Sequence, residues 1–164
     1  MAASIVLVVA VAIRKMSDDE FEQWLPRMRE DYAQGIAEQG GVPAETARAK
    51  AAEEIEDLFP EGLPSPLQSV YVVEADGAPV GELWVAERHE VLHRGALWIF
   101  QVRIDEQARG RGYGREAMLL AENEARRRGL DRIALNVFGG NEAARNLYRS
   151  LGYDEQAVTM RKAL

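Results

Sequence analysis

Residues 109–114 read Arg-Gly-Arg-Gly-Tyr-Gly, between an apolar stretch ending at Ile104 and a segment with helical spacing. Glycines at a strand-to-helix turn let the backbone approach a ligand closely, and the free N–H groups of a helix N-terminus favour an anion. The spacing is not a dinucleotide fingerprint, because Arg115 stands where a third glycine is needed, and no Gly-Lys-Ser/Thr of a Walker loop follows. The stretch predicts a phosphate-binding turn, with a plain tight turn as the alternative.

Outward from this turn, the periodicity predicts one α/β domain over residues 1–164. The apolar run Ile5–Ile13 is too short to span a bilayer, and no positive charge precedes it as in a signal peptide, so it predicts a buried strand. The other expected elements are helices from Ser17 to Gly40 and from Pro43 to Leu58, an antiparallel meander with strands at 70–73, 80–85 and 96–104, a helix over 112–128, a strand over 133–137, a helix from Asn141 to Leu151 and a last strand over 157–164.

Composition and charge narrow the function classes. The chain has a net charge of −7 and no cysteine, which excludes a cysteine nucleophile and a zinc site built on cysteines and favours the cytoplasm. Residues 1–93 hold 7 basic and 18 acidic residues, a net charge of −11, whereas residues 94–164 hold 13 and 9, a net charge of +4. The net acidity argues against a nucleic-acid binder. The asymmetry indicates either two surfaces for ligands of opposite charge or scattered solvated charge.

A second motif competes for the function. His89-Glu90-Val91-Leu92-His93 fits H-E-x-x-H, which on a helix places two imidazoles for zinc and a glutamate as general base. Here it lies in a connection of about ten residues between two predicted strands, where a hairpin loop is the ordinary structure. We therefore expect no metal site and keep a zinc metalloprotease as a remote alternative.

The C-terminal half resembles the GNAT superfamily of acyl-CoA-dependent N-acetyltransferases. Arg109, Gly112 and Gly114 match the family's Arg/Gln-x-x-Gly-x-Gly/Ala loop, and residues 141–153, Asn-Glu-Ala-Ala-Arg-Asn-Leu-Tyr-Arg-Ser-Leu-Gly-Tyr, match its Asn…Ala…Leu-Tyr…Leu-Gly-Phe/Tyr pattern. The resemblance implies a single domain with a mixed, mostly antiparallel sheet, splayed between its fourth and fifth strands and flanked by about four helices. Acetyl-CoA, the acyl donor, would lie in the gap.

The resemblance also assigns roles to residues. The strand backbone at Val102, Arg103 and Ile104 would hold the acetyl and pantetheine groups and supply an oxyanion hole. Asn141 would contact the pantetheine arm, and Tyr148 would protonate the departing thiolate, although helix spacing alone suits a core tyrosine. The residues expected to bind the pyrophosphate are Arg109, Gly110, Arg111, Gly112, Tyr113 and Gly114.

The general base is harder to assign. Some relatives carry a glutamate on the fifth strand, five residues before the matched asparagine, where this chain has Asn136, which cannot act as a base. Glu82, on a meander strand, is our candidate, with an exposed strand carboxylate as the alternative. The acceptor amine in this fold meets the first two helices and the loop before the last strand, here acidic stretches such as Glu53–Asp57 and Asp154–Glu155.

These inferences predict a cytoplasmic acetyl-CoA-dependent N-acetyltransferase. A primary amine, either a small molecule or a peptide N-terminus, would attack the thioester directly in a ternary complex, with neither nucleic acid nor membrane as partner. Because no base is obvious, the alternative is a GNAT-like module that binds acyl-CoA without transferring the acyl group. A homodimer is left open.

Overall fold

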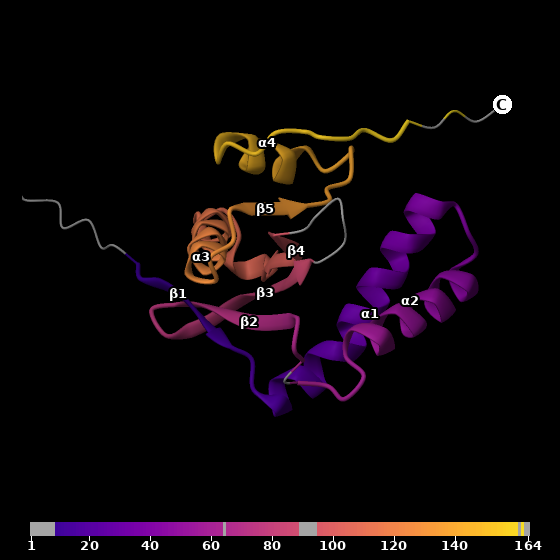
Figure 1. Cartoon of the computed structure of the whole chain (residues 1–164), viewed down its shortest axis with the longest axis horizontal. Coiled ribbons are helices and arrows are strands. Elements are labelled where there is room, and N and C mark those ends of the chain that lie inside the picture. The colour runs from indigo at the N-terminus through magenta and orange to yellow at the C-terminus, as the bar shows by residue number, and fades with distance from the viewer. Residues whose placement is uncertain (1–8, 64, 89–94, 161, 163–164) are drawn as a thin grey trace, which may run out of the picture. The chain divides into compact units, whose positions relative to one another are not determined.

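The computed structural model describes residues 9–63, 65–88, 95–160 and 162. They form two compact units, Met1–Ala134 and Leu135–Leu164, which are described separately. The elements are β1 (Val11–Lys15), α1 (Asp18–Gly40), α2 (Ala44–Leu58), β2 (Gln68–Ala75), β3 (Ala78–Arg88), β4 (Ala96–Ile104), the 3-10 turn η1 (Glu106–Ala108), α3 (Tyr113–Arg127), β5 (Arg132–Leu135) and α4 (Glu142–Ser150), as Figure 1 shows.

The sheet has the order β1-β2-β3-β4-β5, with β1 to β4 antiparallel and β5 parallel to β4. Helix α3 is the crossover that a parallel β4–β5 pair requires. The β3–β4 register shifts between Trp84 and Val85, which face Gln101 and Ile99, so Phe100 is the extra residue of a β-bulge in β4. The predicted α/β fold, with a mixed, mostly antiparallel sheet and four α-helices among the described residues, is confirmed.

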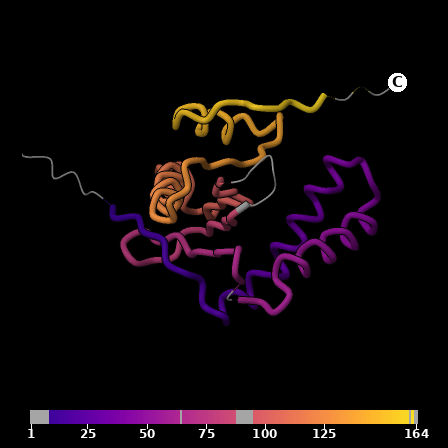
Figure 2. Tube along the Cα trace, viewed as in Figure 1, coloured from indigo at the N-terminus to yellow at the C-terminus, as the bar shows by residue number. Residues whose placement is uncertain are grey.

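The sheet buries both of its faces. Alternate residues of β2 and β3 point to opposite sides. One face packs against α1 and α2, which run side by side in Figure 2, through an aromatic core in which Trp24 meets the rings of Phe59 and Trp84. Helix α3 covers the other face (Figure 1), where Leu83 and Val85 are fully buried.

Local sequence signals explain where the helices begin and end. Ser17 and Glu20 form the predicted capping box of α1, and Gly41, with a φ of 62°, ends that helix in the left-handed conformation. Asn141 caps α4 as expected, since its side-chain oxygen accepts from the Ala144 N–H at 3.1 Å. Caps of this kind fix element boundaries more sharply than periodicity does.

Two strand predictions need correction. Of the buried strand expected over Ile5–Ile13, residues 5–8 lie outside the described part of the chain; the described strand β1 begins at Val11, and none of its residues is buried, because it lies at the edge of the sheet. The strand expected over 157–164 is wrong within its described residues, because 157–160 have no strand pairing. A strand needs a neighbour for its backbone groups, and Val158 and Met160 are instead 71% and 90% exposed.

Within the described ranges, we find no helix with the length and apolar character needed to cross a membrane.

Candidate active site

The glycine-rich turn leads from the end of β4 into α3. Gly110 and Gly112 have φ values of 75° and 83°, a conformation that only glycine adopts at little cost, and a Cβ at either position would meet nothing within 4 Å. Of the side chains that the structure describes, none caps the N-terminus of α3. The first N–H groups of the helix therefore face an open, glycine-lined turn, a geometry that suits an anion.

Two residues of the predicted turn hold it in place. The Arg109 Nε donates to the Ile104 carbonyl at 3.0 Å and ties the turn to the end of β4. Tyr113 is buried in a cluster with Ala75 and Ala108, so its ring anchors the start of α3. Tyr113 can therefore offer a ligand its backbone, while Arg111 remains an exposed cation beside the turn.

The end of β4 pairs closely with β3. Val102, Arg103 and Ile104 face Leu83, Glu82 and Gly81 across the ladder. A Cβ on Gly81 would lie 2.1 Å from the Arg103 carbonyl oxygen, so only glycine permits this approach of the two strands. The pairing sets the predicted base, Glu82, directly opposite a predicted cofactor-binding residue, Arg103.

A cleft of about 320 Å³ opens between the N-terminal half of α1 and the sheet. Glu82 lies on its lining, and its side chain is 14% exposed, so the alternative of an exposed strand carboxylate does not hold. Sequence reasoning missed the other polar residues here, because they come from distant segments that only the fold brings together. The lining residues are Met16, Glu20, Gln23, Trp24, Arg27, Val72, Pro79, Gly81, Glu82 and Asp105.

Arginines from two elements hold the Glu82 carboxylate. The Arg27 Nη2 donates to Glu82 Oε1 at 2.5 Å, and the Arg103 Nη1 approaches Glu82 Oε2 at 3.5 Å. Arg103 also lies 3.6 Å from the Asp105 carboxylate. The result is a chain of alternating charges from α1 to the end of β4, with the carboxylate of Glu82 at its centre.

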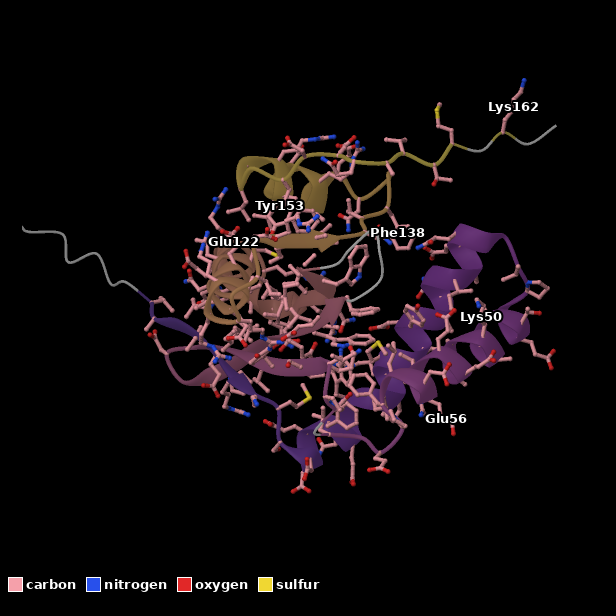
Figure 3. The ribbon with its side chains drawn as sticks, in the orientation of Figure 1. Lys50, Glu56, Glu122, Phe138, Tyr153 and Lys162 are labelled. Atoms are coloured by element: carbon pink, nitrogen blue, oxygen red, sulfur yellow. The ribbon has the colours of Figure 1, made fainter. Side chains whose placement is uncertain are left out.

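The second unit carries the two remaining predicted residues. Asn141 uses its side-chain oxygen to cap α4 and keeps its amide N–H groups for other partners. Tyr148 lies seven residues later, on the same face of α4. Its ring is 5.8 Å from that of Tyr153, which lies beside α4 in Figure 3. Burial raises the pKa of the Tyr148 phenol, so the phenol keeps its proton at neutral pH.

The H-E-x-x-H segment, residues 89–93, lies outside the described residues. Across the rest of the described chain, the Asp and Glu side chains form no group of three or more suited to a metal ion.

Comparisons with known proteins agree with this architecture. The family model of the acetyltransferase (GNAT) family matches residues 12–153. The chain is 29% identical over 157 residues to the uncharacterized N-acetyltransferase YycN of Bacillus subtilis, covering 95% of this chain and 100% of that one. The crystal structure of YycN superposes with a TM-score of 0.83 at 28% identity, covering 94% and 99% of the two chains.

More distant proteins share parts of the pattern. A mycothiol acetyltransferase of Thermomonospora curvata is 33% identical over 121 residues, which are 74% of this chain but 36% of that protein. AAC(6')-Iy, solved with the bisubstrate analogue CoA-S-monomethyl-acetylneamine, has a TM-score of 0.59 at 17% identity over 94% of this chain and 99% of that one, which shows the fold alone. On the family match and the YycN relationship, the chain belongs to the GNAT family of acetyltransferases, whose acyl donor is acetyl-CoA.

Proposed function

We propose that this acetyltransferase transfers the acetyl group of acetyl-CoA to a primary amine by direct attack. The observation that carries the proposal is the β3–β4 pairing, because Glu82 faces Arg103 in register on the strand that runs into the glycine turn. One strand pair thus carries both the carboxylate that lines the cleft and the glycine turn that we expect to bind an anion. The absence of cysteine fits direct attack, since the thiol of an acyl-cysteine enzyme is missing.

The residues of the turn fit the charged end of the donor. The pyrophosphate would rest on the N–H groups at the start of α3, where Gly110 and Gly112 leave open space, with Arg111 as a nearby cation. Backbone N–H groups at Val102–Ile104 would stabilise negative charge on the thioester oxygen, and the Asn141 amide would hold the pantetheine arm. Bound acetyl-CoA supplies an activated acyl group and a thiolate leaving group.

Proton transfer requires a base for the amine and an acid for the thiolate. An ammonium group of lysine type has a pKa of about 10.4, so the amine must lose a proton before it attacks. We assign that proton to the Glu82 carboxylate, which would exchange its Arg27 contact for the incoming amine. Tyr148 would donate its proton to the thiolate, a role that suits a phenol whose pKa is raised.

The test measures CoA release from acetyl-CoA over amines, polyamines, amino acids and peptide N-termini. With an accepted amine, we expect Tyr148→Phe to lower kcat by about a hundredfold, the lower range for general acid catalysis. Tyr153→Phe, which changes a tyrosine of the same unit, is the matched control and should keep most of the activity.

Each part of the proposal can fail separately. If Tyr148→Phe leaves kcat unchanged across pH, the phenol is not the acid. If acetyl-CoA raises the Tm of the protein but no amine is acetylated, the chain is a binding module for acyl-CoA, not a transferase.

A further inference from the structure

The unit of residues 135–164 has no core of its own. Every buried hydrophobic side chain of the described residues belongs to the other unit, and the last of them along the chain is Ala125. Helix α4 contains no buried residue. A unit of this size buries little apolar surface by itself, so its apolar side chains are left for a further contact.

The least covered part of this unit is the segment that follows α4. Residues 154–160 run as an extended chain in Figures 1 and 2, and none of them belongs to a helix or a strand. Val158 is 71% and Met160 90% exposed, whereas no other large apolar side chain of the described residues exceeds 43%. An extended segment with unpaired backbone groups and exposed apolar side chains is a template for strand pairing with another chain.

One face of the segment is already occupied. The Glu155 carboxylate accepts from the Nη2 of Arg145 at 2.7 Å and from the Nη2 of Arg149 at 2.6 Å, both on α4. Successive side chains of an extended chain alternate between two faces, so the even-numbered residues lie on the face away from Glu155. These residues are Asp154, Gln156, Val158, Met160 and Lys162.

This even-numbered face is complementary to a second copy of itself. Asp154 stands at one end, Lys162 at the other, and Val158 midway between them. When two copies run antiparallel about Val158, each Asp154 lies opposite Lys162 of the partner subunit. Opposite charges directly across a ladder stabilise the pairing, whereas a parallel arrangement would set like charges together. The charges therefore favour the antiparallel pairing that a two-fold axis produces.

We propose that the chain forms a two-fold homodimer through this segment, with the two copies paired as antiparallel strands centred on Val158. The ladder gives the backbone N–H and C=O groups their partners and covers Val158 and Met160. The segment of a different protein would satisfy the backbone equally well, but the order of Asp154, Val158 and Lys162 fits its own reverse. The dimer is independent of the proposed function, because the pairing needs neither acetyl-CoA nor an acceptor.

Disulfide trapping tests the register, because the chain has no cysteine of its own. Val158→Cys sets two thiols directly opposite each other at the two-fold axis, within reach of a disulfide. Met160→Cys is the matched control, since Met160 is more exposed at 90%, but its two copies would lie about 13 Å apart along the ladder. Under a mild oxidant, we expect about tenfold more covalent dimer from Val158→Cys on a non-reducing gel. Random collision would favour Met160→Cys, so equal or reversed yields overturn the proposal.

A set of charge reversals measures the same contact without a covalent bond. Sedimentation equilibrium of the full chain gives the Kd of the dimer. Asp154→Lys or Lys162→Asp alone puts like charges opposite each other at two places, and either should raise the Kd about tenfold. The double variant restores both pairs and should return the Kd to within about threefold of the wild type. Glu45→Lys, which makes the same charge change as Asp154→Lys at an exposed residue of the other unit, should leave the Kd unchanged.

Two outcomes of sedimentation overturn the proposal. A wild-type chain that stays monomeric up to about 1 mM has no such dimer. A dimer whose Kd responds to neither reversal forms its contact elsewhere on the molecule. Asp154 and Lys162 are both exposed, so each variant should fold as the wild type does.

Discussion

Two carboxylates lie on opposite faces of the sheet, in contrasting surroundings. Glu124 of α3, 10% exposed, accepts hydrogen bonds from Tyr71, Arg127 and Arg128 at 2.7 to 2.9 Å. Glu82 is similarly shielded at 14%, yet it lines a cleft together with Trp24 and Arg27, each of which has a buried side-chain N–H without an acceptor among the described residues. Burial alone therefore does not mark a functional carboxylate. The one with every partner satisfied joins α3 to the sheet, and the one with unsatisfied neighbours has room for a ligand.

The largest effect should follow from removing the charge of Glu124. Glu124→Gln leaves Arg128, 14% exposed, without its carboxylate, and breaking a buried pair in this way costs about 3 kcal/mol. Chemical denaturation measures the loss in the free energy of unfolding. Glu82→Gln is the matched control, and we expect it to cost no more than about 1 kcal/mol, because its partner Arg27 can turn to solvent. Equal losses would contradict a division into structural and functional carboxylates.

The same two substitutions should affect catalysis in the opposite order, with the larger loss of activity in Glu82→Gln. Glu82→Gln removes the proposed base, and kcat/KM for an accepted amine should fall about a hundredfold, equivalent to about 2.7 kcal/mol. Glu124→Gln, assayed where it is folded, should keep kcat/KM within about threefold of the wild type. A Glu82→Gln enzyme with full activity at every pH would show that solvent, not Glu82, takes the proton.

Lowering the pH from about 4.5 to about 2 should weaken the cluster that Glu124 forms with Arg127, Arg128 and Tyr71. Hydrogen bonds from Arg127, and then from Arg128 and Tyr71, lower the pKa of Glu124 from 4.5 to about 2. A carboxyl whose pKa is lowered by folding stabilises the fold at pH values above the pKa that it has in the unfolded chain. This stability disappears as the pH falls from about 4.5 toward 2. We expect about 2 kcal/mol of the wild-type advantage over Glu124→Gln to vanish there, measured by denaturation at pH 5, 3.5 and 2. A pH-independent difference would contradict the pKa shift.

The sequence predicted the cleft around Glu82 less completely than it predicted the fold. Strand and helix periods, the Ser17 capping box and the Asn141 cap located the elements, because those signals are local. The contact between Arg27 and Glu82 joins residues 55 positions apart, and no local pattern records it. Trp24 fitted the inner face of a helix, and only the structure shows that its indole N–H, unlike that of Trp84, has no acceptor among the described residues. Gly81 did carry a signal, since a glycine inside a strand indicates close backbone approach.

The smallest effect should come from Arg127, although its hydrogen bonds lower the Glu124 pKa most. Its side chain is 69% exposed, so water and salt screen the pair, and Arg127→Ala should cost less than about 1 kcal/mol in the free energy of unfolding.

Arg128→Ala is the matched comparison, because Arg128 is 14% exposed and also contacts Ser69, Tyr71 and Glu87. Its loss should be at least twice as large, since it leaves Glu124 buried beside unsatisfied partners. If denaturation shows that Arg127→Ala costs as much as Arg128→Ala, the cluster depends on a surface ion pair of α3. Burial of the carboxylate together with its partners would then not be the property that distinguishes Glu124 from Glu82.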